Sequence, residues 1–159
     1  MSESVSQFYD DIAEVYRYIF PDWRASARRQ GKTIDAILEA YGFLPASHTL
    51  YDCTCGIGWK VHGTDLSPKA IEKARQYAPE FDMIFPPTFD VLDLLNPREK
   101  YAQYDVVVSL DNAIPHFMTD ADLITGLTTM HDHLKDNGLL LIGIRDYDAL
   151  IENPPYTTM

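Results

Sequence analysis

The segment Tyr104–Asp111, YDVVVSLD, is the feature that most constrains the fold of this chain. It is short and almost wholly apolar, which is the pattern of a strand buried on both faces of a parallel sheet. Parallel strands need crossover connections, which are usually helical, and helix patterns alternate with the other strand patterns here. The alternation predicts an α/β fold with a doubly wound, mostly parallel sheet and N-terminal helices.

The expected elements follow one another along a single domain. We expect helices over 8–20, 23–41, 67–78 and from 119 to about 137, and strands over 49–53, 59–65, 81–85, 104–111 and 139–146. Ser67 before Pro68, and Thr119 before an acid three positions on, are helix-start signals. Gly42 is a stop signal. We divide the chain into an N-terminal helical lid, 1–45, and a Rossmann-like core, 46–159.

The composition excludes several classes of function. The net charge is −11, and no basic cluster stands out beyond Arg24–Arg29, which argues against nucleic acid as a partner. No apolar run approaches the ~20 residues that span a bilayer, and the N-terminus lacks a signal-peptide core. Cys53 and Cys55 are too close for an unstrained disulfide and too few for a metal site, so we expect free thiols in a cytoplasmic protein. We expect His131 and His133 to be solvated.

Polar residues and glycines follow the expected strands. The first strand leads into Asp52, Gly56 and Gly58, and the second ends at Asp65. In parallel sheets ligands bind at the carboxyl ends of the strands, where glycines allow close approach and an acid can accept from ribose hydroxyls. Asp90, after the third strand, is placed to accept from an adenine amino group. The order of these residues predicts an adenosine pocket, but it does not separate a dinucleotide from another adenosine ligand.

Five blocks of the sequence carry a family resemblance. They read, in order, YDCTCGIG, VHGTDLSPKAIEKA, FDVLDL, YDVVVSLDNAIPHF and LKDNGLLLIGIRDYD. Together with the N-terminal YDDIAEVYRYIFPDW, these blocks resemble class I S-adenosylmethionine-dependent methyltransferases, and among them the glycine and sarcosine N-methyltransferases. The resemblance runs from about Tyr9 to Asp148. It implies S-adenosylmethionine as cofactor and methyl transfer to a small molecule, the nitrogen of a small amine or amino acid.

The resemblance also implies roles for individual residues. The cofactor-binding positions that it implies are Tyr9, Tyr16, Arg29, Asp52, Gly56, Gly58, Asp65, Leu66, Asp90, Val91 and Leu110. Asn112 and His116 would border the methyl group and its acceptor as catalytic residues. Arg145 and Tyr147 would bind the substrate, with Arg145 gripping a carboxylate. No metal is implied.

Three of these assignments have alternatives that the sequence leaves open. Arg28 is nearly as good a partner as Arg29 for the carboxylate of the cofactor. His116 is equally well a solvated residue at the start of a helix. Arg145 has an alternative partner in a neighbouring aspartate.

The interval between Gly58 and Asp65 departs from the family pattern. It spans seven positions, whereas a parallel crossover takes roughly a dozen residues or more. We therefore expect the chain to lack a loop and helix after Gly58, and also the strands that follow RDYD in the family. Two origins stay open for the internal interval, namely a disordered segment left out of the printed sequence and a genuine deletion. Thr54 stands where the family usually has its first loop glycine.

Two other classes of protein remain as alternatives. A nicotinamide-dependent oxidoreductase also combines a strand, a glycine loop and an acid, although its fingerprint requires a third glycine. A degenerate, non-catalytic scaffold would tolerate the missing segment. The oligomeric state is open.

Overall fold

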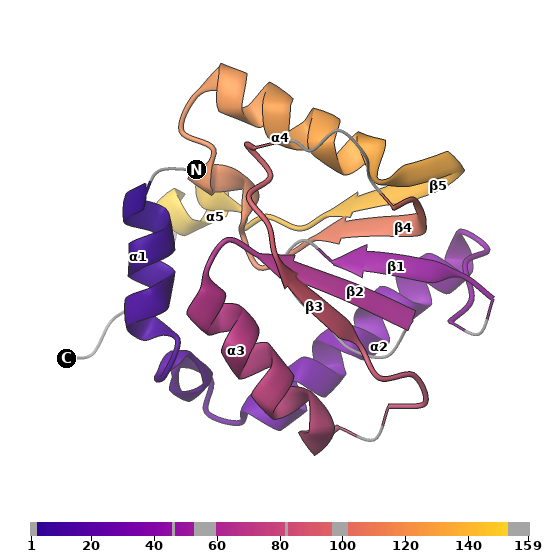
Figure 1. The fold of residues 1–159 in the computed structure, drawn as a ribbon, viewed down its shortest axis with the longest axis horizontal. Coiled ribbons are helices and arrows are strands. Elements are labelled where there is room, and N and C mark those ends of the chain that lie inside the picture. The colour runs from indigo at the N-terminus through magenta and orange to yellow at the C-terminus, as the bar shows by residue number, and fades with distance from the viewer. Residues whose placement is uncertain (1–2, 46, 53–59, 82, 97–101, 153–159) are drawn as a thin grey trace.

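The structure, a computed structural model, describes residues 3–45, 47–52, 60–81, 83–96 and 102–152. Its centre is a five-stranded sheet with the order β3-β2-β1-β4-β5, in which all neighbouring pairs are parallel (Figure 1). The strands are β1 (Thr49–Asp52), β2 (Lys60–Asp65), β3 (Thr88–Val91), β4 (Tyr104–Ser109) and β5 (Leu134–Ile142). The predicted α/β fold with a parallel sheet is confirmed.

Helices cover both faces of this sheet. They are α1 (Glu3–Ile12), η1 (Tyr16–Ile19), α2 (Trp23–Ala40), α3 (Pro68–Tyr77), η2 (Ala78–Glu80), η3 (Ile114–His116), α4 (Asp120–Asp132) and α5 (Tyr147–Glu152). In Figure 1, α2 and α3 lie on one side of the sheet and α4 on the other, while α1 stands beside the end of the sheet where α3 begins.

Local signals in the sequence set the ends of the main helices. The side chain of Ser67 accepts from the backbone N–H of Ala70 to cap α3, and Thr119 accepts from Asp122 to cap α4. Gly42 follows α2 with a φ of 86°, a left-handed conformation that glycine adopts without strain. The predicted start and stop signals are therefore confirmed at these three positions.

Strand β4 is buried on both faces, as its sequence predicts. Val106 and Val108 point to one face and pack with Leu38 of α2. Val107 points to the other face and packs with Met130 of α4. All three valines are at most 1% exposed. Such a strand is stable only at the centre of a layered fold, because each of its two apolar faces must be covered by apolar side chains.

Several predicted boundaries are wrong. The third strand is Thr88–Val91 and not 81–85, because the ladder with β2 begins only after Pro86 and Pro87, which lack an N–H to donate. The helix α4 ends at Asp132, and β5 begins at Leu134 with an irregular register opposite β4. The expected helix over 8–20 is divided into α1 and η1.

His133 is also corrected by the structure. It was expected to be solvated, but it is only 5% exposed. Its ring stacks on Tyr51 of β1 with 4.2 Å between centroids, and its Nδ1 lies 2.7 Å from the carbonyl oxygen of Thr129. The partner that buries the ring comes from a strand far away in sequence, so the local pattern did not show it.

The connection from β1 to β2 remains unusual. The two strands pair in parallel, from Thr49 opposite Lys60 to Asp52 opposite Gly63. Residues 53–59 join them, and these residues, with Gly56 and Gly58 among them, lie outside the described residues. The expectation of a missing loop and helix therefore stays a prediction.

Candidate functional site

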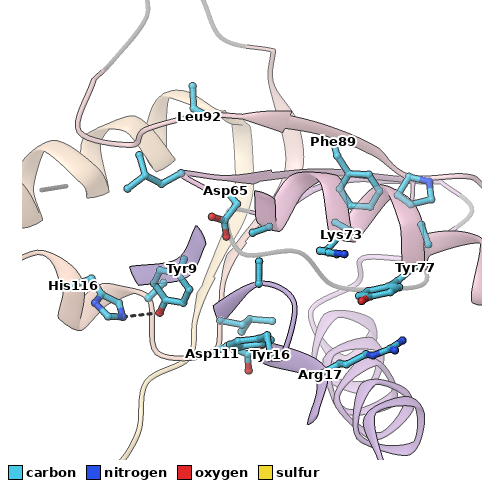
Figure 2. Close-up of a pocket in the computed structure, with 18 of the residues that line it drawn as sticks. Tyr9, Tyr16, Arg17, Asp65, Lys73, Tyr77, Phe89, Leu92, Asp111 and His116 are labelled. Atoms are coloured by element: carbon cyan, nitrogen blue, oxygen red, sulfur yellow. Dashed lines mark hydrogen bonds between the residues drawn. The ribbon is translucent and has the colours of Figure 1, made fainter. Parts of the chain in front are cut away.

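A cavity of about 240 Å³ lies between the N-terminal helices and α3, and it reaches the residues that follow β2 and β4 (Figure 2). The carboxyl ends of parallel strands are where α/β sheets bind ligands. Six of the predicted site residues line this cavity, namely Tyr9, Tyr16, Asp65, Leu66, Leu110 and His116. The structure thus brings together residues from three separate stretches of the chain, 9–16, 65–66 and 110–116.

Asp65 is the acid of this cavity. It is the last residue of β2, and its carboxylate points into the cavity in Figure 2. The backbone N–H of Ser67 donates to its Oδ1 over 2.8 Å. Burial raises the pKa of Asp65, and hydrogen bonds from the backbone of Ser67 and Leu66 oppose that rise. A fixed, partly desolvated carboxylate of this kind accepts hydrogen bonds strongly from hydroxyl groups of a ligand.

Tyr9 and His116 form a pair that also lines the cavity. The Tyr9 hydroxyl lies 2.9 Å from Nε2 of His116, and the two rings meet edge to face. Burial raises the pKa of Tyr9, and the negative charge of Asp65 adds to the rise. Tyr9 therefore stays a neutral hydroxyl at physiological pH, able to donate one proton and accept another.

The turn after β4 presents a second acid. Asp111 and Asn112 both have left-handed backbones, with φ values of 53° and 70°, and the N–H of Ala113 closes the turn on the carbonyl of Leu110. Asn and Asp tolerate this conformation better than other residues with side chains. Gln30 of α2 donates to the Asp111 carboxylate over 3.1 Å. Gln30 was not predicted as a site residue, because no local signal connects it to a residue 81 positions away.

Asn112 fixes this turn to the segment after β5. Its Nδ2 donates to the Tyr147 hydroxyl over 2.6 Å, and its Oδ1 accepts from the backbone N–H of Arg145 over 3.2 Å. The Arg145 charge lowers the pKa of Tyr9 and of Asp111, against the larger effect of burial. Arg145, Asn112 and Tyr147 themselves are not among the residues that line the cavity.

Helix α1 is held over the cavity by contacts with α3. The carboxylate of Asp10 accepts from the Ser67 hydroxyl and from the backbone N–H of Lys69. The hydrogen bond from Ser67 lowers the pKa of Asp10. Glu14 forms an ion pair with Lys73 at 2.7 Å. Asp10 was not predicted as a site residue, although it follows Tyr9 directly on an expected helix.

Among the residues that the structure describes, four of the predicted cofactor residues do not line the cavity. Arg29 donates to Ser26 on its own helix over 2.9 Å. Asp52 is buried, 1% exposed, and lies at the end of β1. Asp90 lies on an edge strand and faces His62 at 3.6 Å, and Val91 beside it is 40% exposed. The alternation of side chains along β3 places Asp90 and Val91 on opposite faces of the sheet.

Among the residues that the structure describes, no group of three His, Cys, Asp or Glu side chains is arranged to hold a metal ion. Within the same ranges, no helix combines the length and the apolarity needed to cross a bilayer.

Fold and site together define a Rossmann-like α/β domain with an acid at the end of its second strand, facing a ligand cavity. Residues 29–140 match the family model described as "Methyltransferase domain". Because this match covers most of the chain, the chain belongs to the methyltransferase domain family. The family match decides against the nicotinamide-dependent oxidoreductase as the family of this chain.

Two curated relatives agree with this family. The chain is 26% identical over 141 residues to the glycine/sarcosine N-methyltransferase of Parasynechococcus marenigrum (strain WH8102), covering 82% of this chain and 48% of that protein. It is 23% identical over 168 residues to the glycine/sarcosine/dimethylglycine N-methyltransferase of Actinopolyspora halophila, covering 96% of this chain and 27% of that protein. The chain therefore spans about half or less of the length of these relatives.

Solved structures agree on the fold. The magnesium protoporphyrin IX methyltransferase from Synechocystis PCC 6803 with bound SAH has a TM-score of 0.63 at 23% identity, covering 83% of this chain and 67% of that one. An S-adenosylmethionine-dependent methyltransferase from Clostridium acetobutylicum ATCC 824 has a TM-score of 0.65 at 15% identity, covering 93% and 60%. At these identities the likeness describes the shared architecture.

Proposed function

We propose that this chain binds S-adenosylmethionine and transfers its methyl group to a small molecule, namely the nitrogen of a small amine or amino acid. The single observation that carries the proposal is Asp65, held at the end of β2 with its carboxylate in the cavity, in a chain of the methyltransferase domain family. The two curated N-methyltransferases named above support the choice of nitrogen as the acceptor.

The residues present fit the adenosine part of this cofactor. Asp65 offers a carboxylate to the ribose hydroxyls, and Leu66, Leu92 and Leu110 offer apolar surface to a flat ring. Gly56 and Gly58 are proposed to hold the methionine part, and they lie outside the described residues. When bound, the cofactor supplies a methyl group on a positively charged sulfur, which makes that carbon electrophilic.

The methyl acceptor must be deprotonated before it can react. An amine attacks with a free lone pair, so the protonated form common at neutral pH must first lose a proton. We assign this proton to Nε2 of His116, which it reaches through the Tyr9 hydroxyl 2.9 Å away. Asn112 positions the turn that carries Asp111, and Arg145 binds an acceptor carboxylate in bidentate fashion.

Cofactor binding tests the first part of the proposal. Isothermal titration of the chain with S-adenosylhomocysteine should give saturable binding with a rise in melting temperature, and titration with NAD should give neither. Absence of binding by the longest natural form of the protein would favour the non-catalytic scaffold and refute the proposed function.

The acceptor is tested by transfer of a labelled methyl group to a panel of small amines and amino acids. In the Arg145→Ala variant we expect the acceptor KM to rise at least tenfold, because a charge-assisted bidentate pair is lost, while affinity for S-adenosylhomocysteine stays unchanged. Arg24→Ala is the matched control, since Arg24 pairs with Glu80 at 2.9 Å and does not line the cavity. A fall in cofactor affinity instead would show that Arg145 is not an acceptor residue.

A further inference from the structure

The second acid of the cavity, Asp111, has no part in the cofactor site proposed above. It lies in the turn after β4, lines the cavity and has a φ of 53°. A left-handed backbone is unfavourable for residues other than glycine, so it persists only where the surrounding structure holds it. Gln30 of α2 donates to the carboxylate over 3.1 Å. The acid is therefore held at the edge of the sheet where ligands bind.

The Asp111 carboxylate has no cation as a partner in the part of the chain that the structure describes. Its hydrogen bond comes from the neutral amide of Gln30, and none of the ion pairs between described residues includes it. The charge of Arg145 acts on it only from beyond ion-pair distance. The residue is exposed, although burial of its carboxyl raises its pKa. A ligand can thus reach a partly desolvated carboxylate, and such a group attracts cations.

The cations that line the same cavity are engaged with other groups. Lys73 pairs with Glu14 at 2.7 Å. The guanidinium of Arg17 lies over two tyrosine rings at 4.9 and 5.1 Å, and it is not among the groups that shift the pKa of Asp111. The charge that Asp111 presents to the cavity is therefore not neutralised by these side chains. This part of the cavity favours a positively charged ligand over a neutral one.

Two tyrosines border this part of the cavity. Tyr9 and Tyr16 both line it, and the negative charge of Asp111 adds to the rise in the pKa of each, so both hydroxyls lie within electrostatic reach of the carboxylate (Figure 2). The Tyr16 hydroxyl makes no hydrogen bond to another residue within the described ranges. An ammonium group suits these surroundings, because aromatic rings attract it and hydroxyl oxygens accept its protons.

We propose that Asp111 selects a protonated amine as the methyl acceptor, its carboxylate accepting hydrogen bonds from the ammonium group beside Tyr9 and Tyr16. The inference rests on the proposed function and names the residue that determines the class of acceptor. The ammonium loses one proton to His116 through Tyr9, as assigned above. Asp111 then stabilises the positive charge that returns to nitrogen, as the N–C bond forms and the C–S electron pair stays on sulfur. A hydroxyl or thiol acceptor lacks this charge on binding, so the site disfavours it.

The test is calorimetric titration of the whole chain at pH 7 with matched probes, with and without S-adenosylhomocysteine. Ethylamine against ethanol, and glycine against glycolate, differ in an ammonium group where the partner has a hydroxyl. Salt at about 0.15 M screens the net charge of −11, so that a general attraction for cations is suppressed. We expect at least one amine to bind tenfold or more tightly than its hydroxyl counterpart. Equal affinity within both pairs, or no binding of either amine, would overturn the proposal.

Variants assign the preference to one acid. Asp111→Asn keeps the shape of the side chain and tolerates the left-handed turn, and it should reduce the preference for the amine to less than threefold. Asp65→Asn should keep most of the preference, and Asp136→Asn, at an exposed aspartate of β5 outside the cavity, should keep all of it. A preference that survives Asp111→Asn, or that disappears in Asp65→Asn, would refute the assignment.

A second variant protects the test against a failure of Asp111→Asn to fold. Gln30→Met leaves the turn itself unchanged and removes the hydrogen bond that holds the carboxylate. It should weaken the preference for the amine about threefold, and an unchanged preference would contradict the proposal. Thermal unfolding of each variant shows whether the fold is intact.

The cofactor analogue keeps the two proposals separable. In Asp111→Asn, kcat/KM for an amine should fall at least tenfold, while affinity for S-adenosylhomocysteine stays within about threefold. If S-adenosylhomocysteine fails to bind while an amine is preferred through Asp111, the proposed function is wrong and the ammonium site stands. If S-adenosylhomocysteine binds and neither amine is preferred, cofactor binding stands and the role of Asp111 is wrong.

Discussion

Replacing Asp65 by Asn should weaken binding of the cofactor without lowering the stability of the free protein. The variant keeps the shape of the side chain and an oxygen that can still accept from the Ser67 N–H, now 2.8 Å from Oδ1. It removes the negative charge that the ribose hydroxyls would meet. A hydrogen bond to a charged group is worth roughly 1 kcal/mol more than a neutral one, so two of them amount to about 2 kcal/mol, or roughly thirtyfold in Kd.

The same substitution should not destabilise the free protein. Burial raises the pKa of Asp65, which means that folding favours the neutral form of this carboxyl. Its stabilising contribution is complete below the unfolded pKa and is lost as the pH rises through the higher folded pKa. At pH 7 the wild-type chain carries the cost of a partly buried charge, and the Asn variant does not. Its melting temperature should stay the same or rise.

The assay is calorimetric titration with S-adenosylhomocysteine, paired with thermal unfolding of the free chain. Asp22→Asn is the matched control, because Asp22 caps α2 by accepting from Ala25 just as Asp65 accepts from Ser67, but it does not line the cavity. As the pH falls through the raised pKa of Asp65, the affinity difference between wild type and Asp65→Asn should close. An unchanged Kd in Asp65→Asn, with the fold intact, would refute the role of Asp65 as the ribose acceptor.

Two further predictions concern catalysis and stability. Tyr9→Phe removes the hydroxyl 2.9 Å from Nε2 of His116, and should lower kcat about ten- to a hundredfold, measured by methyl transfer over a range of pH. Hydrogen bonds from Thr49 and Lys135 outweigh the effect of burial and lower the pKa of Asp105 from 3.8 to about 2. That shift stabilises the fold by about 2 kcal/mol at neutral pH, and this stability should be lost as the pH falls from about 4 towards 2, measured by urea unfolding. Asp105→Asn should remove most of this acid-dependent loss. Tyr41→Phe, at an exposed tyrosine, and Asp136→Asn, at an exposed aspartate, are the controls and should match wild type. If kcat is unchanged in Tyr9→Phe, the proposed proton transfer through Tyr9 to His116 is wrong. If the pH dependence of stability is unaltered in Asp105→Asn, other carboxyl groups cause the loss of stability in acid.

The sequence by itself determined the parts of this protein that depend on near neighbours. The unbroken apolar run of β4 requires cover on both faces, and Leu38 and Met130 provide it. Ser67 and Thr119 cap the helices that follow them, because a cap bonds to an N–H only three residues on. The position of Asp65 at the end of β2 follows from strand length, so its place at the ligand edge was predictable as well.

Only the tertiary structure determined which residues far apart in the sequence are in contact, and towards which face of the sheet a strand side chain points. A prediction of the third strand at 81–85 failed, because the true strand is the segment that reaches β2 after two prolines. Asp90 was expected at the adenine, and the register of β3 turns it towards His62. The contact of Tyr9 with His116 spans 107 positions, and that of Gln30 with Asp111 spans 81. Hydrogen bonds and apolar contacts act over a few ångströms, so only the packing of helices on the sheet sets which of these residues meet in the cavity.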